Sequence, residues 1–363
     1  MRINKVFSIL IGITFMLQAC GNSGAMETDV PANVEPNDSQ FSSAELTAAA
    51  APGGEFFLPI SFRSGIGFHG PWLELYFTDP ANPLSAHEIG GVDAFLATAI
   101  VEAKESVDVA LRGLTLDSIT KALILAHDRG VAVRVVTETD SLKSRSKLQI
   151  LEAAGIPLVD DQQAGLMNNR FIIIDHREVW TGSLNYSTVG VFLENAVLLR
   201  VFSEELAADY TMEFDEMFVN KQFGLLMVPK TPYPNVTIDG TRVEALFSPD
   251  DIVSNRLIQL ISEAKESIYF LAFAFGSNDL GKAIRDKAAQ GIQVSGILEF
   301  NESDPDETNS FQIEQIDLFR RAGLDIRLDG TPEEMNHKFI IIDGKIVVTG
   351  SYDFTTRAEI DND

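Results

Sequence analysis

The chain contains one stretch twice, and this duplication limits what it can fold into. The first copy, NNRFIIIDHREVWTGSLN, runs from Asn168 to Asn185, and the second, NHKFIIIDGKIVVTGSYD, runs from Asn336 to Asp353. A Phe-Ile-Ile-Ile run bounded by polar residues predicts a buried strand. The Asp after it predicts a turn into a second strand, which ends at Thr-Gly-Ser. Each copy is therefore predicted to form a β-hairpin.

The alternation of side chains along a strand predicts which motif residues share a face. Asn168 and Arg170 should point the same way, as should Asn336 and Lys338. His337, which lies between the last two, should point to the opposite face and pack behind the site. A local bulge that turned His337 inward is the alternative.

Matching segments around the two copies indicate that a whole domain is repeated. Glu102–Ser106 and Glu263–Ser267 both read Glu-Ala-Lys-Glu-Ser, after an apolar-periodic helix and before a strand. The next helix ends at Gly130 or Gly291, where glycine is the preferred C-terminal cap, and another strand follows. Each half thus predicts a β-α-β-α-β unit that closes on the hairpin. The fold class is α/β, with mixed sheets flanked by helices and a pseudo-two-fold axis between the repeats.

The limits of the repeats follow from the same comparison. Leu73–Pro80 and Val243–Asp250 align, and each predicts a strand that closes in a turn. We assign residues 55–232 to the first repeat and residues 233–363 to the second. The second repeat stops at residues 361–363, where the pattern of the first continues through a further strand and helix, so a C-terminal truncation is expected.

The N-terminus has the layout of an export signal. Arg2 and Lys5 precede an apolar run that leads to Cys20, the one cysteine of the chain. A small residue before a lone cysteine resembles the lipobox of bacterial lipoproteins. This resemblance implies a signal peptide over residues 1–19, cleavage before Cys20 and lipidation of its thiol. An ordinary signal with an incidental cysteine is the alternative.

Residues 20–54 are polar and acidic, so they predict a flexible tether. Together with the lipobox, the tether predicts an exported protein that is lipid-anchored to the bacterial cell envelope, at the outer or the inner membrane. With no second cysteine, the folded part has no internal disulfide to rely on.

Composition excludes some partners. Hydrophobic residues make up 45% of the 363 residues, which is enough for two ordinary cores, and the formal net charge is −25. Since nucleic-acid affinity depends on cationic contacts to phosphate, a non-specific nucleic-acid partner is not expected, although one basic cleft is compatible with this charge. A polybasic membrane-docking face is not expected either.

The duplicated stretch resembles the signature of the phospholipase D superfamily, H-x-K-x4-D-x6-G-S-x-N, which that family carries once per repeat or once per subunit of a dimer. The resemblance covers about Glu55 to Asp363. The matching positions are Asn168, Arg170, Asp175, Gly182, Ser183 and Asn185 in the first copy and Asn336, Lys338, Asp343, Gly350, Ser351 and Asp353 in the second. With both copies in one chain, the resemblance requires no oligomer.

The resemblance implies phosphodiester chemistry without a metal or other cofactor. In the family one motif histidine attacks phosphorus and the other protonates the leaving alcohol. Here Asn168 and Asn336 occupy both positions. A carboxamide is neither a nucleophile nor a proton donor near neutral pH, and loss of the acid alone costs a factor of roughly 100 to 10,000. We expect a degenerate active site with weak hydrolysis or none.

The rest of the motif is expected to hold phosphate. Arg170 and Lys338 supply charge, and Ser183, Asn185 and Ser351 supply neutral hydrogen bonds. Asp353 stands where the family has asparagine, and its charge should weaken anion binding unless it is paired or protonated.

One further position of the family pattern lies after the first motif. Glu194 matches a glutamate that orients the motif histidine in the family. With Asn168 in place, Glu194 is expected to have lost its partner.

Three functions stay open. The chain binds a phosphodiester or phospholipid head group at the envelope without turning it over, or it is an active phospholipase D-type hydrolase or transphosphatidylase with an unusual nucleophile. The third alternative is a structural or partner-binding lipoprotein.

Overall fold

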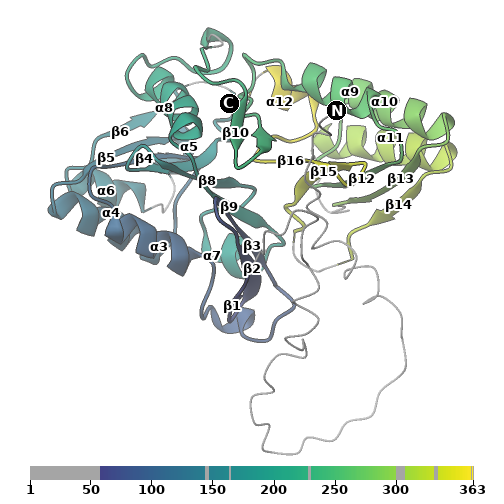
Figure 1. Cartoon of the computed structure of the whole chain (residues 1–363). Coiled ribbons are helices and arrows are strands. Elements are labelled where there is room, and N and C mark those ends of the chain that lie inside the picture. Colours follow the sequence, from purple (N-terminus) through teal and green to yellow (C-terminus); the bar gives the residue numbers. More distant parts are fainter. Residues whose placement is uncertain are drawn as a thin grey trace, which may run out of the picture.

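Each copy of the motif lies in a sheet of its own, one in each half of the computed structural model (Figure 1). The structure describes residues 58–143, 147–162, 165–227, 230–299, 307–330, 334–360 and 362. The expected signal peptide, Cys20 and the tether lie outside the described residues. Among the residues that are described, no helix has both the length and the apolar character needed to cross a bilayer.

The first half is a nine-stranded sheet in the order β1-β2-β3-β9-β8-β7-β4-β5-β6. Its strands are β1 (Leu58–Phe62), β2 (Gly65–His69), β3 (Leu73–Thr78), β4 (Ser106–Leu111), β5 (Ala132–Thr137), β6 (Leu158–Asp160), β7 (Arg170–Ile174), β8 (Glu178–Gly182) and β9 (Val197–Phe202). Its helices are η1 (Ser85–His87), α3 (Asp93–Glu102), α4 (Asp117–Asp128), α5 (Thr139–Lys143), α6 (Leu148–Ala153), α7 (Thr188–Phe192), α8 (Glu204–Phe218) and η2 (Gly224–Leu226).

The second half is a five-stranded sheet in the order β14-β13-β12-β15-β16, preceded by a separate hairpin of β10 and β11. The strands are β10 (Val236–Ile238), β11 (Thr241–Val243), β12 (Ser267–Ala272), β13 (Gln293–Leu298), β14 (Asp325–Leu328), β15 (Lys338–Ile342) and β16 (Ile346–Thr349). The helices are α9 (Val253–Ser262), α10 (Asn278–Ala289), α11 (Glu307–Arg321) and α12 (Thr356–Ile360).

The two sheets share one pattern of neighbours. Strand β4 pairs parallel with β5 and antiparallel with the motif strand β7, just as β12 pairs parallel with β13 and antiparallel with the motif strand β15. Both motif strands continue into antiparallel hairpin partners, β8 and β16. The predicted mixed α/β repeats and motif hairpins are confirmed.

The Phe-Ile-Ile-Ile run is apolar at every position because both faces of the first sheet are covered. Ile172 and Ile174 pack into a core with residues of α3, α4 and α6, whereas Phe171 and Ile173 pack into another core with residues of α8. All five residues of β7 are buried, and the same holds for β15. A continuous apolar run is what a strand buried on both faces requires.

The strand predicted over Val243–Asp250 is wrong beyond its first residue. β11 ends at Val243, and the following residues form no strand. Phe247 instead packs edge-on against Tyr210 with ring centroids 4.9 Å apart, within the core of the first repeat. The apolar side chains of this segment are satisfied by contact with the other repeat, which local pattern does not reveal.

The two halves also bond to each other through the backbone. The amide of Asn195 donates to the carbonyl of Glu334 at 3.1 Å, and the amide of Asn336 donates to the carbonyl of Asn195 at 2.9 Å. Nearby, the rings of Phe77 and Phe339 stack with centroids 6.4 Å apart. These contacts bring the start of β15 against the first repeat.

The motif aspartates lie at the far ends of the motif strands, away from the motif asparagines and the cations. Asp175 is about 16 Å along β7 from Arg170, at roughly 3.3 Å per residue. Its carboxylate accepts hydrogen bonds from three successive backbone amides before β4, and Asp343 does the same before β12. The donors are Lys104, Glu105 and Ser106 for Asp175, and Lys265, Glu266 and Ser267 for Asp343.

These amides dominate the electrostatics of both aspartates. Burial alone would raise the pKa of Asp175, but the three amide donors outweigh it and hold the pKa below its ordinary value. The pKa of Asp343 is lowered in the same way. Each aspartate therefore fastens the turn of its hairpin to the neighbouring strand.

Replacing either aspartate should destabilise the fold. We expect Asp175→Ala and Asp343→Ala each to lower the free energy of unfolding by about 1 kcal/mol, because three backbone amides, two of them on exposed residues, lose a charged acceptor. The carboxylate's contribution is present above its unfolded pKa and is lost as pH falls through the lower folded pKa, so the difference should shrink in acid. Denaturant titration checks this, with the exposed Asp128→Ala as control; equal losses in all three variants would contradict it.

Candidate functional site

The two copies of the motif meet through a reciprocal pair of hydrogen bonds. The side-chain amide of Asn168 donates to the backbone carbonyl of Ser351 at 3.1 Å. In the opposite direction, the side-chain amide of Asn336 donates to the carbonyl of Ser183 at 2.9 Å. Each asparagine thus binds the Gly-Ser turn of the other repeat, and the site is built from both halves.

Two cations lie beside these asparagines. Arg170 is 6% exposed and donates to the Asn168 carbonyl oxygen at 3.1 Å and to the backbone carbonyl of Ser183. Lys338 is 1% exposed and donates to the Asn336 carbonyl oxygen at 2.7 Å, with its ammonium 4.6 Å from the ring centroid of Phe273. Strand alternation brought each cation to the side of its asparagine, as the sequence predicted.

Burial disfavours the protonated, charged form of both side chains and so lowers the pKa of each. It lowers the pKa of Lys338 to about 8; nearby Asp353 opposes this change, and Arg170 adds to it. The pKa of Arg170 is lowered by burial as well, again opposed by Asp353. Both cations carry charge at neutral pH, because Arg titrates far above it and Lys338 still titrates above it.

Asp353 supplies the anion that faces these cations. Its carboxylate lies 3.1 Å from the ammonium of Lys338, and its side chain is 17% exposed. The matching residue of the first copy, Asn185, donates instead to Glu194 at 2.7 Å. The two motif copies therefore end differently, one with an amide that binds a carboxylate and one with a carboxylate that binds an ammonium.

Glu194 has partners, contrary to the expectation that Asn168 had deprived it of one. It is buried and accepts hydrogen bonds from Asn185 and, at 3.1 Å, from the side-chain amide of Asn336. The glutamate of the first repeat thus reaches the motif position of the second repeat. Sequence alone linked it to Asn168, because the two positions lie in one copy.

The motif serine of the first copy, Ser183, differs from the predicted phosphate-binding hydroxyl. The hydroxyl of Ser183 is fully buried and accepts from the backbone amide of Val197 at 3.2 Å. What Ser183 gives to the site is its backbone carbonyl, and Ser351 likewise offers its carbonyl to Asn168. Ser351 is half-buried.

His337 lies among aromatic rings. It is 4% exposed, with ring centroids 5.5 Å from Phe339 and 6.1 Å from Phe77. Burial lowers its pKa to about 4, and the charge of Lys338 adds to this, so the ring is neutral at physiological pH. His337 thus contacts one aromatic ring from each repeat, Phe77 of the first and Phe339 of the second.

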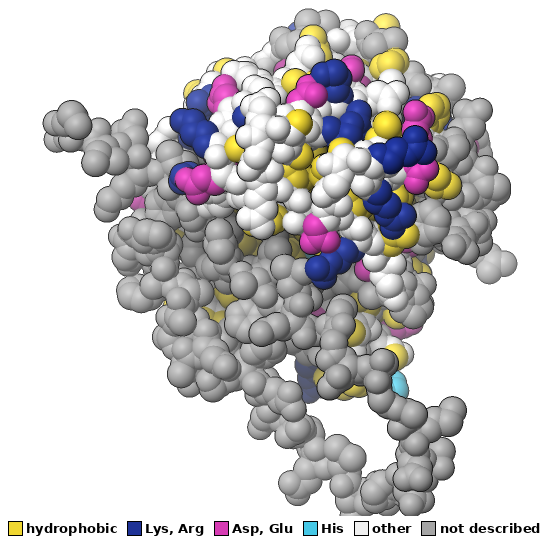
Figure 2. Space-filling model, turned by 90° about the vertical axis from the view of Figure 1, so that its right-hand side faces the viewer, with side chains coloured by type: hydrophobic (Ala, Val, Ile, Leu, Met, Phe, Trp, Pro, Cys, Tyr) yellow, Lys and Arg dark blue, Asp and Glu magenta, His cyan; other side chains and the backbone are white. Residues whose placement is uncertain are grey.

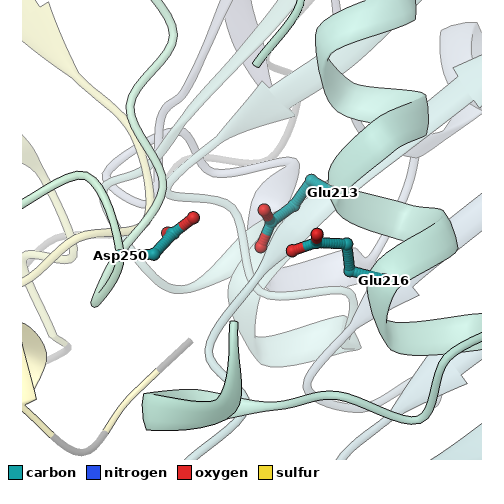
Figure 3. A group of neighbouring side chains, drawn as sticks. All are labelled: Glu213, Glu216 and Asp250. Atoms are coloured by element: carbon teal, nitrogen blue, oxygen red, sulfur yellow. The ribbon is translucent and has the colours of Figure 1, made fainter. Parts of the chain in front are cut away.

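A separate group of carboxylates lies between α8 and the loop after β11. Figure 3 shows Glu213, Glu216 and Asp250 facing one another. One carboxylate oxygen from each residue lies within 4.8 Å of the other two. Such oxygens suit hard cations. The group already contains a cation of the chain itself, because Lys230 forms an ion pair with Glu216.

A cavity of about 570 Å³ opens elsewhere on the first repeat, next to β2, β3 and α3. Three of its polar side chains contact one another: His69 lies 2.8 Å from Glu74, and Arg200 lies 3.2 Å from Glu74. Arg200 also forms a hydrogen bond with Glu178. The cation of this cavity is therefore neutralised by two carboxylates.

Cations on the outer side of the second repeat are dispersed. Figure 2 shows Lys and Arg side chains interspersed with Asp and Glu on this side. On α10, Lys282 pairs with Asp286 at 2.6 Å, and on α11 Arg321 pairs with Asp317 at 3.6 Å. This mixture lacks the single-signed stripe that binding to a polyanion favours.

Comparison with protein families matches both halves of the chain. Residues 96–218 and 257–363 match the family described as "Cardiolipin synthase, PLD-like domain". Human mitochondrial cardiolipin hydrolase is 33% identical over 124 residues, which are 34% of this chain and 49% of the human protein. A phospholipase D of Rickettsia conorii is 35% identical over 135 residues, which are 37% of this chain and 63% of that protein. The matches thus span about half to two thirds of these relatives.

Solved structures share the fold over a larger part of the chain. Phosphatidylserine synthase from Haemophilus influenzae superposes with a TM-score of 0.54 at 12% identity, covering 76% of this chain and 80% of that protein. Polyphosphate kinase from Porphyromonas gingivalis superposes with a TM-score of 0.51 at 15% identity, covering 75% of this chain and 41% of the kinase. At these identities the likeness concerns the arrangement of the two repeats.

The carboxylate group should make stability depend on pH. Burial, with the charges of Asp251 and Glu216, raises the pKa of Asp250 to about 6. The folded state therefore binds more protons than the unfolded state between about pH 4 and 6, and the free energy of unfolding should rise as pH falls through this window. We expect Asp250→Asn to be more stable than the native protein at pH 7 by on the order of 1 kcal/mol and to depend less on pH.

Thermal denaturation between pH 7 and pH 5 measures this effect. Asp128→Asn is the control, since its exposed carboxylate should leave the pH dependence as it is. If the stability of Asp250→Asn depends on pH as that of the native protein does, Asp250 is not the source of this pH dependence.

Proposed function

The chain belongs to the phospholipase D superfamily in its two-repeat form, and we propose that it binds a phosphodiester or phospholipid head group between its motif copies with little or no hydrolysis. The observation that carries this proposal is the convergence of two buried cations from different repeats. Arg170 and Lys338 sit beside the two motif asparagines, at the position that the family uses for phosphate.

Charge and hydrogen bonding at this position suit a phosphate group. The guanidinium of Arg170 can bind two oxygens at once, and the ammonium of Lys338 acts as a point charge. Low local dielectric strengthens both interactions. The side-chain amide of Asn168, which uses one N–H for the carbonyl of Ser351, can add a neutral donor, whereas the amide of Asn336 already donates to Ser183 and Glu194.

The same residues argue against efficient hydrolysis. All five histidines of the chain lie in its described part. Two of them lie in the motif copies: His176 in the turn after β7, and His337, beside Asn336, buried among aromatic rings. The motif positions hold amides, which can neither form a phosphoryl intermediate nor protonate an alcohol.

A phospholipase D-type hydrolase with another nucleophile is the second candidate. It is favoured by the relatives, which bear the names cardiolipin hydrolase and phospholipase D. We further propose that the protein acts at the bacterial cell envelope, tethered through Cys20; this proposal rests on the N-terminal sequence.

Ligand-induced stabilisation tests binding. A soluble phosphodiester at millimolar concentration should raise the melting temperature of the native protein, because it binds the folded state alone. Arg170→Ala combined with Lys338→Gln should abolish the shift, measured against that variant's own melting temperature. Lys282→Ala combined with Arg321→Ala, which removes exposed cations, should retain it. No shift in the native protein would favour a structural role instead.

Turnover of a chromogenic phosphodiester and of phosphatidylcholine tests hydrolysis. We expect the native protein to be inactive within detection and Asn168→His with Asn336→His to gain measurable activity, because a complete acid–base pair is worth a factor of roughly 100 or more. Asn336→His places its imidazole beside Glu194, which now contacts Asn336. Activity in the native protein would overturn the non-hydrolytic reading and support the second candidate.

A further inference from the structure

Two positive and two negative side chains with low exposure lie at the two-repeat site, and the exposed Arg112 acts on Arg170 from its edge. Arg170 and Lys338 are the cations, and Glu194 and Asp353 are the anions. Three of the four are at least nine-tenths buried, and Asp353 is the most exposed of them. The charges of these four side chains are thus balanced before any ligand arrives.

Asp353 acts on both cations of the site. Its carboxylate lies 3.1 Å from the ammonium of Lys338, which belongs to the same motif copy. Among the charges around Arg170, which belongs to the other repeat, Asp353 also exerts the largest stabilising effect on the protonated guanidinium. Its carboxylate therefore lies against Lys338 and acts electrostatically on Arg170, at the place that a bound phosphate would use.

The first copy of the motif shows what the second has changed. Asn185, at the position equivalent to Asp353, carries no charge and uses its amide to hold Glu194. In the second copy the carboxylate of Asp353 takes the place of that amide and pairs with the motif lysine. The chain thus provides its own reference for an uncharged residue at this position.

Resting on the proposed function, we propose that Asp353 determines which phosphodiester the site accepts, favouring net-neutral zwitterionic head groups over net-anionic ones. The ligand's phosphate replaces the Asp353 carboxylate on Lys338 and Arg170. The released carboxylate, which is the solvent-facing member of the group, then receives an ammonium carried by the ligand.

The reason is the cost of an unpaired charge in a buried site. A phosphodiester without a cation would leave one excess negative charge beside Glu194 and Asp353, in surroundings that solvate it poorly. A head group with an ammonium brings its own counter-charge, so the site stays balanced before and after binding. An uncharged residue at position 353 would remove this requirement.

Two soluble head-group diesters of similar size test the proposal. The probes are sn-glycero-3-phosphoethanolamine, which is zwitterionic, and sn-glycero-3-phosphoglycerol, which carries one net negative charge. Calorimetric dissociation constants would be measured at pH 7 for the native protein, for Asp353→Asn and for the exposed control Asp317→Asn. We expect the native protein and the control to bind the zwitterion roughly 10-fold tighter, and Asp353→Asn to bind the anion as tightly as the zwitterion or more so.

Titration of Lys338 without ligand provides an independent measurement. In side-chain NMR, the pKa of Lys338 should fall in Asp353→Asn, because the carboxylate that favours its ammonium is gone. Asp353→Ser, which is also uncharged, should reproduce both the titration and the binding result. A pKa of Lys338 that does not change would overturn the pairing on which the proposal rests.

The outcomes separate this inference from the proposed function. Binding of both diesters with the same ratio in the native protein and Asp353→Asn overturns the role of Asp353 but leaves the phosphate site standing. A native preference for the anionic diester does the same. Failure of every variant to bind either diester overturns the proposed function and this inference together.

Discussion

Two cationic side chains buried between the repeats impose the main requirement on this structure. An unpaired charge in a protein interior costs several kcal/mol, so Arg170 and Lys338 need acceptors within reach. These acceptors come from both copies of the motif: the asparagine side chains, the carbonyl of Ser183 and the carboxylate of Asp353. Each cation takes these acceptors from its own copy, and docking of the two halves fixes the asparagine acceptors, because each asparagine amide donates to the serine carbonyl of the other copy.

The asparagines at the two motif positions meet this requirement without charge. Each uses its carbonyl oxygen to accept from the cation of its own copy and its amide to donate to the Gly-Ser carbonyl of the other copy. A carboxamide offers both functions in every protonation state, whereas an imidazole changes its donors and acceptors with pH. The architecture of the superfamily site is thus retained by residues that cannot carry out its chemistry.

The duplication leaves the site symmetric in its backbone and asymmetric in its charges. Glu194 from the first repeat binds both Asn185 and Asn336, while Asp353 from the second repeat binds Lys338. One carboxylate is deeply buried and fixed by amides, and the other is more exposed and fixed by a cation. This difference allows one of them to respond to a ligand while the other holds the two repeats in register.

Local pattern determined the hairpins, the repeat of strand and helix, and the sharing of a face by Asn168 and Arg170, because the periodicity of strands and helices can be read from consecutive residues. Tertiary structure alone decided which residues these side chains contact. Glu194 contacts Asn336 rather than Asn168, the Val243–Asp250 segment packs on the first repeat instead of pairing as a strand, and Asp175 and Asp343 bind amides 69 or more residues away. These partners are distant along the chain, and only the docking of the two halves and the pairing of their strands brings them within hydrogen-bond distance.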